Sequence, residues 1–142
     1  MSEVKTYDFK QVQCILGANI LTGFADGDAI SMEYESNLFN LTVGADGEAT
    51  RSKTNNRSAK VTIKLLKTST ANDILNEFYQ SDLLSNGGVF PFMLKDSNGV
   101  ELHAAEKMWI EKEPSAPFGV DAPQREWTLR THFMVSNFGG NL

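Results

Sequence analysis

The residues that could carry chemistry in this sequence are few and widely separated. His103 and His132 are the only histidines, and Cys14 is the only cysteine. Their spacing matches no metal-binding or nucleophile motif. Each histidine lies among polar neighbours in a strand-like stretch, so we expect both at the surface or rim. Cys14 alternates with Val12 and Leu16, which favours a small buried hydrophobic residue. We therefore predict a protein that is not an enzyme and needs no metal or cofactor.

Two Asp-Gly segments, DGD at 26–28 and DGE at 46–48, resemble parts of calcium-binding loops. An EF-hand needs oxygen ligands at alternate positions and a late bidentate Glu, and neither segment supplies them. Turns between strands are the simpler interpretation. Gly44 and Gly47 also lack the Lys and Ser/Thr of a phosphate-binding loop.

Composition points to one globular domain spanning residues 1–142. The chain is 41% hydrophobic and has a formal net charge of −5, which argues against a basic nucleic-acid-binding stripe. Its apolar runs fall short of the roughly 18 residues that span a bilayer, so we expect no membrane insertion. The segment MSEVKTYDFK lacks the apolar core of a secretory signal. We expect synthesis and folding in a reducing cytoplasm.

Alternating apolar residues predict a mainly β fold. Residues 59–65 alternate strictly, and the last strand, REWTLRTHFMV, places Trp127, Leu129, Phe133 and Val135 on one face. A single amphipathic helix is predicted at about residues 70–84, with Ser69 or Thr70 as the cap. Many strands with one helix indicate an antiparallel β-sandwich or partly closed barrel with the helix packed on it.

Residues 28–43 read as an amphipathic hairpin turning at Ser36-Asn37. This pairing sorts apolar side chains onto one face and polar ones onto the other, and a slip of one residue would destroy the sorting. The apolar face comprises Ile30, Met32, Tyr34, Phe39, Leu41 and Val43. The polar face comprises Ser31, Glu33, Glu35, Asn40 and Thr42.

The polar stretch 46–58 has Ala49 as its only apolar side chain. It is a mobile loop, a ligand-binding loop, or a polar strand pair turning at residues 54–56 and completed by another molecule. A strand pair without an apolar face is marginal alone, and edge-to-edge pairing with a neighbour would stabilise it.

Several segments together resemble the tail tube proteins of contractile-tailed bacteriophages. They are TGFADGD, VGADGEATRSKTNNRSAKVTIKLLKTSTANDIL, LKDSNG and REWTLR, in order from about residue 10 to the C-terminal GGN. The tubes of pyocin-like particles and of the type VI secretion system are related to this family.

The resemblance implies a virion structural protein of the phage tail. Hexameric rings of the chain would stack into a tube inside a contractile sheath, and DNA would pass through the bore without sequence-specific binding. The implied partners are further copies of the chain, the sheath protein, the baseplate hub, the tail terminator and a tape-measure protein in the lumen.

On this interpretation the polar face of hairpin 28–43 lines the bore, and its apolar face packs on the sandwich. The stretch from 46 to 60 makes contacts between subunits. The contact candidates are Asp46, Glu48, Arg51, Lys53, Asn55, Asn56, Arg57 and Lys60. Both chain ends are short, so contacts between rings would fall to this stretch or to the Pro-rich loop 113–124.

Two alternative functions share the predicted fold. One is another ring-forming tail or baseplate protein or a tail terminator, and the other is a monomeric β-sandwich that binds a ligand. The second would show an exposed aromatic platform, for which Trp109 and Phe118 are the candidates.

Overall fold

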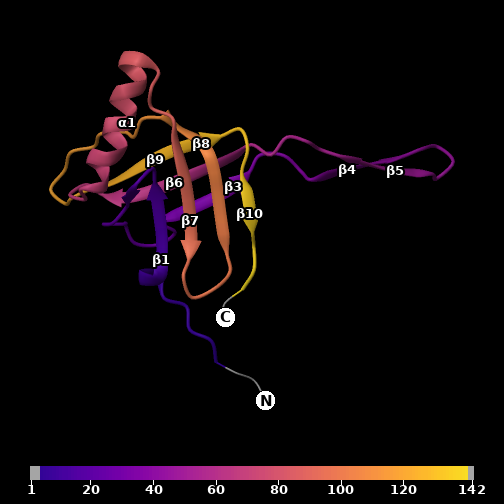
Figure 1. The fold of residues 1–142 in the computed structure, drawn as a ribbon, viewed down its shortest axis with the longest axis horizontal. Coiled ribbons are helices and arrows are strands. Elements are labelled where there is room, and N and C mark those ends of the chain that lie inside the picture. The colour runs from indigo at the N-terminus through magenta and orange to yellow at the C-terminus, as the bar shows by residue number, and fades with distance from the viewer. Residues whose placement is uncertain (1–3, 141–142) are drawn as a thin grey trace.

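The computed structural model describes residues 4–140, which form an antiparallel β structure with one α-helix (Figure 1). The strands are β1 (Val12–Leu16), β2 (Asn19–Ile20), β3 (Ile30–Tyr34), β4 (Phe39–Val43), β5 (Ala49–Lys53), β6 (Ala59–Leu66), β7 (Phe90–Asp96), β8 (Leu102–Lys112), β9 (Gln124–Thr131) and β10 (Val135–Asn137). The helix α1 spans Ala71–Ser85, and a short 3₁₀ turn spans Phe9–Gln11. This confirms the predicted fold class.

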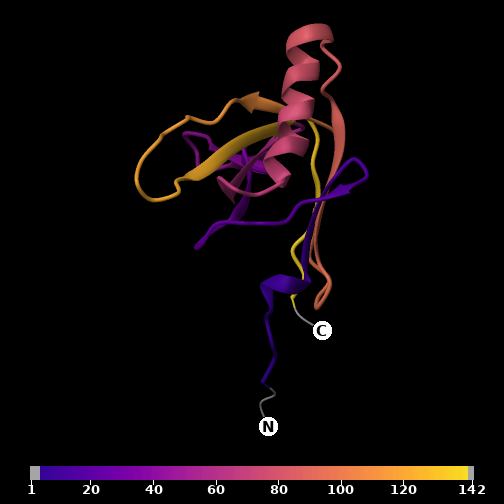
Figure 2. The same cartoon turned by 90° about the vertical axis from the view of Figure 1, so that its left-hand side faces the viewer.

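Eight strands form one sheet in the order β2-β1-β7-β8-β9-β6-β3, with β10 beside β8. Neighbouring strands are antiparallel. The sheet curves, and α1 stands against one side and extends beyond its edge (Figure 2). The remaining strands, β4 and β5, form a separate two-stranded sheet that projects far from the body (Figure 1).

The core lies on the inner face of the curved sheet, under the helix. Its fully buried members include the inward residues of β6, which are Ala59, Val61, Ile63 and Leu65. Cys14 is also buried, and burial raises the pKa of its thiol to about 12. The predicted faces of β1 and β6 are therefore confirmed.

The first backbone amide of the helix is capped by a side-chain acceptor. The Ser69 Oγ accepts a hydrogen bond from the Ala71 amide at 3.1 Å, whereas Thr70 makes no side-chain cap. The buried Asn72 side chain donates to three carbonyls, at Leu66, Lys67 and Ser69, and its Oδ1 accepts from Trp127 Nε1 at 3.0 Å. These bonds join the start of α1 to β9.

The helix ends at Ser85 and is capped by Asn86, which adopts a left-handed backbone conformation (φ 58°), a conformation that Asn tolerates better than most residues.

The predicted pairing of the two strands in residues 28–43 is wrong. β3 pairs with β6, with Ile30 opposite Ile63 and Met32 opposite Val61. β4 pairs with β5 instead. The long-range partner prevails because β6 offers a fully buried apolar face, and Ser36-Asn37 is a poor two-residue turn.

The predicted turn at residues 54–56 is also wrong, because the chain reverses at residues 44–48. There the Gly44 amide donates to the Glu48 carbonyl at 2.7 Å, and Gly47 has a φ of +89°. The Asp46 carboxylate accepts from the Glu48 amide. DGE at 46–48 is therefore a turn, as the simpler interpretation predicted.

The apolar side chains of β4 do not pack on the body. Leu41 and Val43 are 71% and 59% exposed, so the prediction that they join the core is wrong. Ile30, Met32 and Tyr34 of β3 do pack against the core.

The last predicted strand is interrupted. β9 ends at Thr131 and β10 starts at Val135. Trp127 and Leu129 are buried as predicted, but Phe133 and Val135 are 52% and 60% exposed.

Candidate assembly surfaces

A polar face covers the outer side of strands β8, β9, β6 and β3. Cross-strand pairing brings Glu33 opposite Lys60, and Lys64 opposite Glu126. Opposite charges facing each other across strands stabilise a sheet modestly. The predicted bore residues Ser31 and Glu33 therefore share one surface with Lys60, which the sequence analysis had placed at a subunit contact.

An ion-pair cluster lies on the same face. Arg130 Nη1 contacts Glu111 Oε1 at 3.1 Å, and Nη2 bonds to Glu35. The hydrogen bond to Glu35, together with the nearby charge of Glu111, raises the pKa of Arg130 above its ordinary value. The guanidinium therefore stays charged and joins β9 to β8 and to the end of β3.

Sequence reasoning missed part of this face. Thr62, Thr128 and Arg130 contribute to it from β6 and β9, and alternation with buried neighbours marked each of them as outward-facing. The alternating pattern does not give the strand order, and only the strand order shows that these residues are neighbours of Ser31 and Glu33.

The projecting hairpin β4–β5 has two unlike faces. Its register pairs Leu41 with Arg51 and Thr42 with Thr50, and directly paired residues share a face. One face comprises Phe39, Leu41, Val43, Ala49, Arg51 and Lys53. The other comprises Asn40, Thr42, Thr50 and Ser52, so two of the predicted bore residues lie here rather than on the main sheet.

The remaining predicted contact residues lie at the two ends of this hairpin. Asp46 and Glu48 form its tip. At its root the Asn56 Nδ2 donates to Ser36 Oγ at 3.1 Å, and the Arg57 guanidinium lies 4.0 Å from the centre of the Tyr34 ring.

The structure also assembles a Glu–His–Ser series that the sequence analysis did not find. His103 Nε2 lies 2.8 Å from Glu101 Oε2, and His103 Nδ1 lies 2.7 Å from Ser136 Oγ. The Tyr34 hydroxyl lies 2.7 Å from the same Ser136 oxygen. His103 is only 3% exposed, so the expected surface position is wrong.

This series is a cross-strand connection. Ser136 on β10 is the direct partner of His103 on β8, and the Tyr34 hydroxyl also donates to the Met134 carbonyl at 2.9 Å. The bonds therefore tie the C-terminal strand to the end of β3, where the hairpin begins.

Among residues 4–140, no three His, Cys, Asp or Glu side chains gather closely enough to hold a metal ion. Within that part of the chain, α1 is neither long nor apolar enough to cross a bilayer.

Several solved structures share this fold. The tube-terminating cap of the anti-feeding prophage superposes with a TM-score of 0.65 at 10% identity, covering 96% of this chain and 94% of the cap chain. The sheath/tube terminator of the extracellular contractile injection system PVC gives 0.66 at 12%, covering 96% and 99%. A chain of the PVC sheath–tube complex in the extended state gives 0.63 at 12%, covering 89% and 88%. The fold is thus one that tube and terminator assemblies of contractile injection systems contain.

Sequence comparison specifies the family. Residues 4–137 match the family described as bacteriophage PhiTE tail tube protein. Structural protein ORF10 of Pseudomonas phage KPP10 is 29% identical over 144 residues, covering 96% of this chain and 83% of that protein. The chain belongs to this phage tail tube family and is a virion structural protein of the phage tail, as the resemblance predicted.

Proposed function

We propose that the chain forms the inner tail tube by stacking hexameric rings, within which the polar face of β8, β9, β6 and β3 lines the bore. The observation that carries the proposal is a pair of free strand edges. In the described chain, β3 pairs only with β6, and the pairing of β7 with β8 ends at Met108. Residues 109–112 of β8 therefore have backbone groups open on the side away from β9. Such edges bind other strands readily.

The strand order suits closure by rotation. Four successive antiparallel strands separate the two free edges. Because four is even, β3 of one copy is antiparallel to β8 of the next when the copies are related by rotation about the tube axis. Six copies would make a barrel larger than the porins, whose roughly 16–18 strands already enclose an aqueous channel.

The charge of this face suits passage of DNA. Its acidic members are Glu33, Glu35, Glu111 and Glu126, and its basic members are Lys60, Lys64, Lys112 and Arg130. Acids and bases balance, so the wall has no excess of cations to retain phosphates. We expect DNA to pass without sequence-specific binding.

The other expected partners follow from the family. A fold neighbour comes from a sheath–tube complex, which supports assembly inside a contractile sheath. Contacts with the baseplate hub, a tail terminator and a tape-measure protein, and synthesis in the host cytoplasm, are part of this proposal, as is the absence of catalysis. Family membership gives no support to the monomeric ligand-binding alternative.

A terminator is the second candidate, because two of the fold neighbours come from terminator structures. A terminator would form single rings, whereas a tube protein adds ring upon ring. Negative-stain electron microscopy of the purified chain across a concentration series separates the two. We expect hollow filaments or stacked rings that lengthen with concentration. Rings of one fixed height would support the terminator, and monomers that stay monomeric even with a baseplate seed would refute both.

A further inference from the structure

One end of β9 has an open edge inside the sheet. β9 pairs with β6 along its whole length, from Gln124 to Thr131, but with β8 only from Thr128 onward, because β8 ends at Lys112. Alternate residues of an antiparallel strand direct their N–H and C=O groups to opposite edges. Half of residues 124–127 therefore direct these groups into the row that β8 has left. Among residues 4–140, no backbone hydrogen bond reaches residues 124–127 from that side.

A hollow lies on each face of β9 beside this open edge. One hollow, of about 400 Å³, faces α1, and the other, of about 350 Å³, lies on the polar face. Residues 113–115 line both hollows, so they form the far wall of a slot beside β9. The other lining side chains include, toward α1, Asn76, Tyr79, Arg125 and Trp127, and, on the polar face, Lys112, Glu126 and Thr128. A strand in the slot would place successive side chains in the two hollows in alternation.

The loop that joins β8 to β9 does not close the slot. Pro114 and Pro117 have no N–H to donate, so the loop cannot continue β8 as a fully paired strand. The loop swings out from the sheet (Figure 2) and is held beside the end of β6. There Lys67 Nζ lies 3.9 Å from the centre of the Phe118 ring, and the Lys67 amide donates to the Pro123 carbonyl at 3.3 Å. The slot therefore stays open within the subunit.

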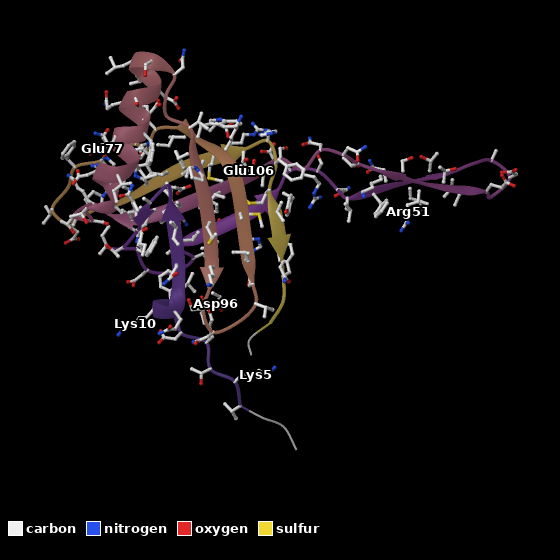
Figure 3. All side chains as sticks on the ribbon, viewed as in Figure 1. Lys5, Lys10, Arg51, Glu77, Asp96 and Glu106 are labelled. Carbon is white, nitrogen blue, oxygen red and sulfur yellow. The ribbon has the colours of Figure 1, made fainter. Side chains whose placement is uncertain are left out.

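The same chain does not supply a strand for the slot. Residues 4–8 lie against the body, where Tyr7 and Phe9 line a separate hollow. The hairpin β4–β5 carries Arg51 and projects away from α1, which carries Glu77 (Figure 3). The two strands of that hairpin already pair with each other. We therefore look to a different protein for the missing strand.

The lining of the slot defines the chemistry of that strand. Toward α1, the rings of Tyr79 and Trp127 stand edge to face with their centres 6.4 Å apart. Arg125 lies beside them and forms no ion pair within residues 4–140. Aromatic rings and a guanidinium suit a large apolar or aromatic side chain. The hollow on the polar face suits a hydroxyl or amide.

Charge does not select the occupant of the slot. The charged side chains that line the two hollows are Asp73, Glu113, Glu126, Lys112 and Arg125. Acids and bases nearly balance, so backbone hydrogen bonds and one large apolar side chain would hold the strand.

We propose that an extended segment of a different tail protein adds to β9 as a strand at residues 124–127. Its large apolar side chain lies beside Tyr79, and its polar side chains face Glu126 and Thr128. This proposal rests on the proposed tube function for the setting of the partner, whereas strand addition itself can be tested on the monomer.

A tethered peptide tests strand addition. Ser115→Cys places an exposed thiol on the wall of the slot, and native Cys14 is fully buried and does not compete. The probe is the peptide Ac-Cys-Gly-Gly-Thr-Phe-Thr-Leu-Thr-NH2, joined to that thiol by a disulfide, which gives it a high effective concentration. We expect the amides of residues 124–127 that face the slot to exchange with deuterium at least about tenfold more slowly than in the variant without peptide.

N-methylated probes are the matched controls. In one probe the Thr residues carry N-methyl groups, and in the other the Phe and Leu carry them, so each probe lacks donors on one edge only. One probe should lose the protection and the other should keep it, because a single edge of the added strand faces β9. Equal behaviour of the two probes, or no protection by the unmethylated peptide, would overturn strand addition.

Filling the hollow tests whether a tail protein uses the slot. Asn76→Trp places a ring in the hollow toward α1, and Glu77→Trp is the control, because exposed Glu77 lies on the same helix outside that lining. Both purified chains should form tubes. Phage carrying Asn76→Trp should give at least about tenfold fewer infectious particles, and phage carrying Glu77→Trp should match the wild type.

The outcomes separate this contact from the tube itself. Equal titres of the two phage variants would overturn the use of the slot. Loss of tubes from purified Asn76→Trp alone would assign the slot to a second copy and overturn the different partner. A wild-type chain that never self-associates would refute the tube function, whereas the tethered peptide would still decide strand addition.

Discussion

Strands β3 and β4 have similar sequence patterns but different surroundings in the structure. Each has five residues with apolar side chains at alternate positions. β3 lies against β6, whose inward residues are fully buried, and its own apolar face joins the core. β4 lies against β5, which supplies only Ala49 on that face beside Arg51 and Lys53. The apolar face of β4 therefore remains largely in solvent.

The difference shows what an alternating pattern specifies. It fixes which residues share a face, because successive side chains point to opposite sides of a strand. It does not specify the surface that covers that face. For β3 that surface is in the same subunit, whereas Leu41 and Val43 of β4 stay exposed. Measurements on β3, β4 and their neighbours can test how sharply the two regions differ.

Thiol reactivity should show the largest contrast. At pH 8, the cysteine of Leu41→Cys should react with iodoacetamide at the rate of an exposed thiol in the monomer. Cys14 should react only through unfolding, at least about 1,000-fold more slowly. The rates can be followed by mass spectrometry of tryptic peptides. Comparable rates would mean that the sheet around Cys14 opens as easily as the hairpin.

The buried thiol of Cys14 should make the protein less stable at alkaline pH. The pKa of Cys14 is raised from 9.0 to about 12 by burial, so the unfolded thiol ionises first. The unfolded state therefore gains stability between about pH 9 and 12, and the free energy of unfolding should fall by up to about 1.4 kcal/mol per pH unit from this group. Cys14→Ala should lack this contribution in urea titrations.

Truncation of apolar side chains should show the next largest difference between the core around β3 and the projecting hairpin. Ile63→Ala removes the buried partner of Ile30 and should lower the free energy of unfolding by about 2–5 kcal/mol. Leu41→Ala in the monomer should change it by less than about 0.5 kcal/mol. Chemical denaturation followed by circular dichroism measures both. A large loss for Leu41→Ala would show that the hairpin already packs on its own body.

A smaller effect is expected at Tyr34, where the two regions join. Tyr34→Phe removes the hydroxyl that bonds to Ser136 and to the Met134 carbonyl, and should cost about 0.5–1.5 kcal/mol. The exposed Tyr7 provides the control, and Tyr7→Phe should be neutral. Equal stability of the two variants would show that this connection does not hold β10 to β3.

Local patterns predicted much of the fold and less of the site. The faces of β6 and the helix followed from periodicity and from stop signals at its end. The pairing of β3 did not, because its partner lies some thirty residues downstream and nearby β4 has the same pattern. The burial of His103 was hidden because its partner Ser136 comes from a strand that only the fold brings beside it. The sequence predicted that Ser31 and Glu33 lie on a polar face. Only the strand order shows that Thr128 and Arg130 of β9 belong to the same face.

The smallest effect on stability is expected at Glu33, on the polar face of β3. Glu33→Lys places like charges opposite each other, because Lys60 is its cross-strand partner. The residue is exposed, so the free energy of unfolding should change by less than about 0.5 kcal/mol and tubes should form. If this face lines the bore, six added lysines per ring would attract phosphates and slow DNA ejection. Phage carrying Glu33→Gln serve as the control for loss of the acid alone. Normal ejection kinetics from Glu33→Lys phage would place the face outside the bore, and failure of the subunit to fold would make Glu33 a structural residue.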